Sequence, residues 1–100
     1  MSEASKAIWK FPIAVPGGVV TMPYGAQILT AQVQGNTIML WAVVDPAEAV
    51  RSTRRFEIVG TGWSFKESDK RYIATVQQNG FVWHVFEVVG ALGRLVSALV

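Results

Sequence analysis

An Asn-Gly pair, Asn79-Gly80, separates two strand-like runs near the end of the chain. This dipeptide between apolar runs is the strongest short-range signal of a β-hairpin, because both residues accept the positive φ angles of a type I′ turn. The sequence therefore predicts a hairpin of residues 71–78 and 81–89. Counting outward from a two-residue loop gives these cross-strand pairs: Gln78 with Phe81, Val76 with Trp83, Thr75 with His84, Ala74 with Val85 and Ile73 with Phe86.

This register sorts the hairpin side chains onto two faces, since alternate residues of a strand point to opposite sides. Both faces are largely apolar, so we expect the hairpin to lie inside a closed barrel or between layers rather than at an exposed edge. The first face holds Tyr72, Ala74, Val76, Phe81, Trp83 and Val85, and the second holds Ile73, Thr75, Val82, His84 and Phe86.

The residues before the hairpin predict further short strands. A two-residue alternation or a β-like composition marks 6–13, 19–22, 26–34 and 53–59, and proline and glycine separate these runs. The run 38–44 is apolar throughout, which predicts a central strand covered on both faces. The predicted fold class is therefore all-β, a small antiparallel barrel or sandwich of about six to seven short strands.

Three connections carry specific turn signals. Gly35 stands at the first central position of a predicted type II′ turn. Asp45-Pro46-Ala47-Glu48 has the N-cap aspartate and following proline of a short helix. Ser64 and Glu67 have the spacing of a capping box, which predicts one helical turn or a capped loop between strands.

Length and composition predict a single domain. The chain has 100 residues, of which 51% are hydrophobic and 16% charged, enough for one core. We expect a flexible N-terminus at 1–5, one β domain at 6–89, and an apolar tail at 90–100 whose spacing fits a short C-terminal helix. The longest apolar run, 38–44, is far shorter than the roughly 20 residues that span a bilayer, so we expect neither a membrane segment nor a secretory signal.

The residue inventory argues against an enzyme. The chain has no cysteine and a single histidine, His84, so the usual nucleophiles, bases and metal ligands are almost missing. We expect His84 to be structural, with the Thr75 hydroxyl bonded to a ring nitrogen. Gly60-Thr61-Gly62 is too short for a phosphate-binding loop and predicts a strand end. The prediction is a non-catalytic protein with no metal and no cofactor.

Exposed aromatic and basic residues are the candidates for contact with a partner. The net charge is +2, and most of the basic residues lie between 51 and 71. Trp63 stands in a glycine-flanked loop and is the best single candidate for an exposed contact residue. The predicted binding residues are Trp63, Phe65, Arg54, Arg71 and Lys66.

Five segments carry a resemblance to known proteins: 6–11, 22–29, 40–45, 55–62 and 81–87. Together they resemble a family of small proteins of unknown function that tailed bacteriophages and prophages encode. The resemblance covers residues 6–87, with Trp63 and the tail beyond Glu87 as departures from the family pattern. It implies expression in the cytoplasm of an infected bacterium and binding to a host or phage protein.

The leading hypothesis is thus a phage-type accessory protein that acts by protein–protein binding. One alternative is a small β-barrel that binds nucleic acid, because basic and aromatic residues interleave between 54 and 72. A second alternative is a virion or assembly component that forms a homo-oligomer through the tail at 90–100.

Overall fold

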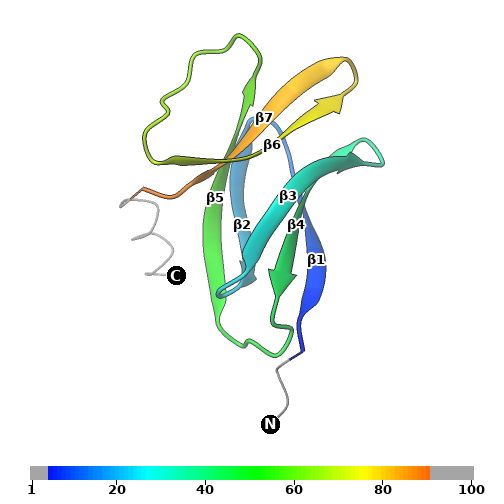
Figure 1. The fold of residues 1–100 in the computed structure, drawn as a ribbon, viewed down its shortest axis with the longest axis vertical. Helices are drawn as coiled ribbons and strands as arrows, with labels where there is room; N and C mark the ends of the chain where they lie inside the picture. Colours follow the sequence, from blue (N-terminus) through cyan, green and yellow to red (C-terminus); the bar gives the residue numbers. More distant parts are fainter. Residues whose placement is uncertain (1–4, 91–100) are drawn as a thin grey trace.

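The computed structural model describes residues 5–90, and within them it contains seven β-strands and no helix (Figure 1). The predicted all-β class is confirmed. The expected N-terminal segment falls mostly, and the expected helical tail almost wholly, outside the described residues. The strands are β1 (Ala7–Ile13), β2 (Gly17–Pro23), β3 (Gln27–Gln34), β4 (Thr37–Val44), β5 (Arg51–Gly60), β6 (Lys70–Gln78) and β7 (Phe81–Val88).

The strands form two antiparallel sheets. A three-stranded sheet has the order β1-β4-β3, and a four-stranded sheet has the order β2-β5-β7-β6. Of the two architectures that the sequence left open, the structure is therefore the sandwich. β3 and β6 are edge strands of different sheets that lie beside each other, as Figure 1 shows on the right of the molecule.

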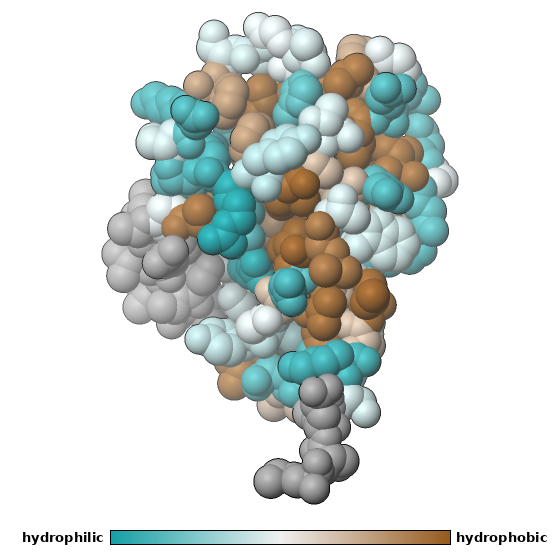
Figure 2. Space-filling model, in the orientation of Figure 1, coloured by the Kyte–Doolittle hydropathy of each residue, from teal (hydrophilic) through white to brown (hydrophobic). Residues whose placement is uncertain are grey.

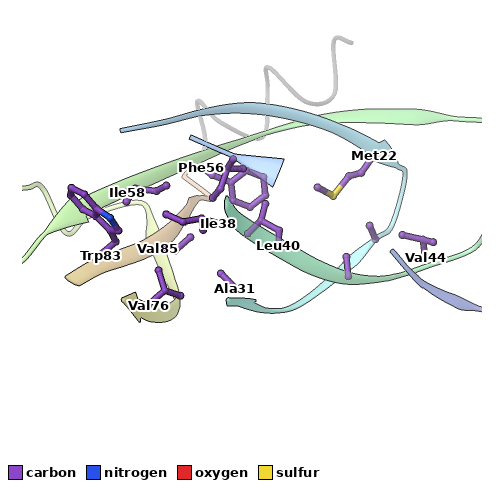
Figure 3. Close-up of a cluster of buried hydrophobic side chains, with 13 residues drawn as sticks. Met22, Ala31, Ile38, Leu40, Val44, Phe56, Ile58, Val76, Trp83 and Val85 are labelled. Carbon is purple, nitrogen blue, oxygen red and sulfur yellow. The ribbon is translucent and has the colours of Figure 1, made fainter. Parts of the chain in front are cut away.

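The core consists of the inward faces of both sheets. Figure 3 shows Ile38 and Leu40 of one sheet pointing toward Phe56 and Val85 of the other. Trp83 closes one end of this cluster. Burial of a large apolar side chain contributes about 1.5–3 kcal/mol each, so this cluster is the main source of stability.

The expected double covering of residues 38–44 is wrong. β4 is central in its sheet as predicted, but only alternate side chains, such as Leu40 and Ala42, are fully buried. The opposite face is half-buried, and there Lys10 lies over the Trp41 ring with Nζ 5.8 Å from the ring centroid. The exposed Lys10 beside Trp41 shows that the expected second covering layer does not close this face within the described residues.

The β6–β7 hairpin confirms most of the predicted register. The pairs from Gln78 with Phe81 back to Ala74 with Val85 occur as predicted. Beyond them the expected pairing of Ile73 with Phe86 is wrong, because a β-bulge lies between Tyr72 and Ala74 and Tyr72 pairs with Phe86 instead. The extra residue moves Tyr72 to the outer face, opposite to the face that we expected.

The expectation that this hairpin avoids a sheet edge is also wrong. β7 is an inner strand, but β6 is the edge strand of the four-stranded sheet. On the outer face of the hairpin, the loop of residues 61–69 packs Phe65 against Phe86, while Tyr72 and Val82 stay exposed.

Two of the predicted connections differ from the structure. Gly35 and Asn36 both have positive φ, 55° and 66°, which is a type I′ turn rather than type II′. Asp45 begins a turn and no helix: its side chain accepts a hydrogen bond from the Ala47 amide at 2.9 Å, as an N-cap does, but β5 already begins at Arg51. Residues 64–67 form a loop without a helical turn.

The surface contains both hydrophobic and charged regions. Figure 2 shows hydrophobic side chains gathered along the middle of the visible face, over β3 and its neighbours, with hydrophilic residues at the margins. Leu29, at a second β-bulge in β3, is exposed on this strand. Among residues 5–90 no helix is long and apolar enough to cross a membrane.

A buried ion pair joins β5 and β7, neighbouring strands of the four-stranded sheet. Arg54 donates from Nε and Nη2 to the two carboxylate oxygens of Glu87, at 2.6 and 2.8 Å. Its Nη1 donates to the carbonyl oxygen of Ala26, just before β3. The side chains of Arg54 and Glu87 are only 17% and 7% exposed. This bidentate geometry satisfies a charge that would otherwise be costly to bury.

We predict that Arg54→Met destabilises the protein by roughly 3–5 kcal/mol, because it leaves the Glu87 carboxylate buried without its partner. Urea unfolding followed by circular dichroism measures the change. Arg55→Met is the matched control: Arg55 is exposed, and we expect a change within about 0.5 kcal/mol. Equal effects of the two substitutions would contradict this account of the ion pair.

Candidate functional site

The loop of residues 61–69 carries two of the predicted contact residues, Trp63 and Phe65. It connects β5 to β6, and every residue in it is exposed. Trp63 is 52% exposed and Phe65 is 42% exposed. Large apolar side chains in such a loop stand out, because folding would ordinarily bury them.

Trp63 has a fixed position despite its exposure. Its backbone amide donates to the carbonyl oxygen of Gly60 at 3.0 Å. Its ring meets the Trp83 ring edge to face, with the centroids 5.5 Å apart. A Cβ on Gly60 would lie 2.7 Å from Cε2 of Trp63. The indole therefore occupies the space that a side chain at Gly60 would fill.

An open pocket of about 320 Å³ lies between this loop and the outer face of β7. We call it the aromatic groove. Phe65 packs on Phe86 with ring centroids 5.1 Å apart, and Tyr72 meets Phe86 edge to face at 5.7 Å. No charged side chain lines it. The lining residues are Val59, Gly60, Thr61, Gly62, Trp63, Phe65, Tyr72, His84 and Phe86.

A chain of hydroxyl groups engages both nitrogens of His84 in this groove. His84 Nε2 lies 2.7 Å from Thr61 Oγ1, and His84 Nδ1 lies 3.0 Å from Thr75 Oγ1. Thr75 Oγ1 is also 2.6 Å from the Tyr72 hydroxyl. The predicted contact between His84 and Thr75 is therefore present. Because hydroxyls both donate and accept, either imidazole tautomer is satisfied, and the groove presents mainly apolar surface.

A second pocket of about 460 Å³ lies on the other face of the edge strand β6, and Tyr72 lines both pockets. We call it the arginine pocket. It contains the Arg54–Glu87 ion pair and Arg71, which is exposed and has no ion pair within the described chain. The pocket thus has a net positive charge. Its lining residues are Gly25, Ala26, Gln27, Ile28, Leu29, Arg54, Arg71, Tyr72, Ile73 and Glu87.

The structure places four of the five predicted contact residues in these two pockets. Trp63 and Phe65 line the aromatic groove, and Arg54 and Arg71 line the arginine pocket. Lys66 is exposed on the loop but lines neither.

Three further lining residues, Tyr72, His84 and Phe86, were not among the predicted contacts. The predicted hairpin register places His84 and Phe86 on the same face. The sequence therefore contained a signal that these two residues lie together. Tyr72 joins them only through the bulge beside Ala74.

The other basic residue near the groove, Lys70, is already neutralised. Its Nζ lies 3.5 Å from Glu57 and 3.3 Å from Asp69. No group of three or more histidine or acidic side chains in residues 5–90 could hold a metal ion.

The fold and the two pockets define a small antiparallel β-sandwich with an aromatic groove and a cationic pocket on its surface. The chain belongs to the family described as Domain of unknown function (DUF7352), whose match covers residues 4–92. A search among curated proteins and a search among solved structures each found no match.

We predict that Gly60→Ala displaces the Trp63 indole from Trp83, because the new methyl group takes the space of the ring. The aromatic pair contributes about 0.5–1.5 kcal/mol, so stability falls by roughly that amount. Loss of the nuclear Overhauser effects between the two indoles measures the displacement. In a Trp63→Ala background, Gly60→Ala should lower the free energy of unfolding much less. An equal cost in both backgrounds would show that the indole does not occupy this space.

Proposed function

We propose that this protein is a non-catalytic interaction module that binds another protein through the aromatic groove. The observation that carries the proposal is the gathering of exposed rings around one pocket. Trp63, Phe65 and Tyr72 are 52%, 42% and 57% exposed, and all three line the groove. Aromatic side chains clustered around a surface pocket are typical of the energetic centre of a protein interface.

The fixed positions of these rings support the proposal. Trp63 packs on Trp83, Phe65 packs on Phe86, and Tyr72 bonds to Thr75. Side chains that are held before binding lose little conformational freedom when a partner covers them. The surface is therefore suited to form a contact without rearrangement of its own residues.

The charges favour a protein partner over nucleic acid. A surface that follows a phosphate backbone needs several free cations. Here Lys70 and Arg54 are engaged by acidic side chains. The only exposed cations on the loop and in the arginine pocket are Lys66 and Arg71, and no charged side chain lines the groove. Nucleic-acid binding remains the alternative hypothesis.

The biological setting is part of the proposal. The resemblance to small proteins of phages and prophages supports an accessory protein that acts in the cytoplasm of an infected bacterium on a host protein. The all-β domain with a preformed surface pocket is compatible with this role.

We predict that Phe65→Ala reduces capture of a specific partner from bacterial lysate at least tenfold, because a ring at the centre of an interface contributes roughly 2 kcal/mol or more. Quantitative mass spectrometry of affinity-purified complexes measures this. The control is Ile8→Ala, which removes a side chain that is 61% exposed on the other sheet.

A partner that is captured equally by wild type and Phe65→Ala, or that is lost equally with Ile8→Ala, would contradict the proposal. Steeply salt-dependent binding of oligonucleotides that depends on Phe65 would favour the nucleic-acid alternative.

A further inference from the structure

We infer that the segment bound by this protein is acidic, with one apolar side chain in the aromatic groove and a carboxylate on Arg71 in the arginine pocket. This inference rests on the proposed function and names the chemistry of its partner. The two pockets share Tyr72 and lie on opposite faces of the edge strand β6, so a segment that passes around this edge can occupy both.

The aromatic groove selects an apolar side chain. No charged group lines it, and the two nitrogens of its single histidine, His84, are engaged by Thr61 and Thr75. A polar ligand group placed there would lose its water and find few partners. A volume of about 320 Å³ is at the lower end for ligand pockets, which suits one or two side chains better than a large cofactor.

The arginine pocket selects a carboxylate. Arg54 directs two donors at Glu87 and one at Ala26, so Arg54 and Glu87 neutralise each other. Arg71 lines the same pocket, is exposed, and has no acidic partner within the described residues. A guanidinium binds a carboxylate through two parallel hydrogen bonds, which makes an acidic residue the complementary ligand.

This charge complementarity distinguishes an acidic peptide from nucleic acid. A single unpaired arginine beside an apolar groove matches one carboxylate next to one apolar anchor. A phosphate backbone would instead need several cations in a row, and the neighbouring Lys70 is held by Glu57 and Asp69.

The test is a nuclear magnetic resonance titration of the full chain with three pools of dodecapeptides. Each pool has a central Leu, Phe or Trp, with flanks that are acidic, neutral or basic, and oligothymidine is the fourth probe. We expect the acidic pool to shift the amide signals of Phe65, Arg71, Tyr72 and Phe86. Its affinity should exceed that of the neutral pool about fivefold, as one partly exposed ion pair would give.

Two variants locate the charge preference. Arg71→Glu should abolish the advantage of the acidic pool and favour the basic pool. The matched control is Arg55→Glu, because Arg55 is an exposed arginine that lines neither pocket, and it should leave the preference for the acidic pool in place. Phe65→Ala should weaken binding of all three pools by a similar factor.

Equal affinity for the three pools, failure of every pool to bind at millimolar concentration, or an unchanged preference in Arg71→Glu would overturn the inference. If a lysate partner still depends on Phe65, the inference alone fails and protein binding stands. If only oligothymidine shifts the groove signals, both the inference and the proposed function fail.

Discussion

The positions of the core and of both pockets depend on which side chains of the β6–β7 hairpin face the opposite sheet. Val76, Trp83 and Val85 must be inward, because they close the core against the three-stranded sheet. With strict alternation Tyr72 would share that inward face. One extra residue, Ile73, shifts the phase of β6, so the core keeps its apolar contacts while Tyr72 moves outward to Phe86. The same local irregularity therefore completes the core and supplies a wall of both pockets.

Two rigid contacts hold the residues that line the two pockets in fixed positions. Gly60, at the end of β5, leaves room for the Trp63 ring against Trp83, so the loop is attached to the core at its start. The Arg54–Glu87 pair fixes the inner wall of the arginine pocket and reaches the turn before β3. A mutation in either support would act on binding and on stability together.

Local signals in the sequence predicted the local structure well. Asn79-Gly80 fixed the hairpin register as far as Ala74, and the glycine-flanked position of Trp63 predicted its exposure. The bulge beside Ala74 could not be predicted, because both faces of the hairpin are apolar and neither register breaks the pattern. Asp45 accepts the backbone hydrogen bond that a helix N-cap accepts, but it does so in a turn.

Contacts between residues far apart in the sequence could not be predicted from it. Arg54 and Glu87 are 33 positions apart, and no periodicity connects them. The strand order β5-β7-β6 brings Arg71 beside Arg54, and the contact between the edge strands β3 and β6 depends on how the two sheets pack.

The most direct test of the account is a nuclear Overhauser spectrum of the aromatic and methyl protons. We expect cross-peaks from the Tyr72 ring to Phe86 and Thr75 on the outer face, and from the Ile73 methyl groups to the core. Cross-peaks from Tyr72 to Ala31 or Val33, with Ile73 opposite Phe86, would show regular pairing without the bulge. That result would remove both pockets as described.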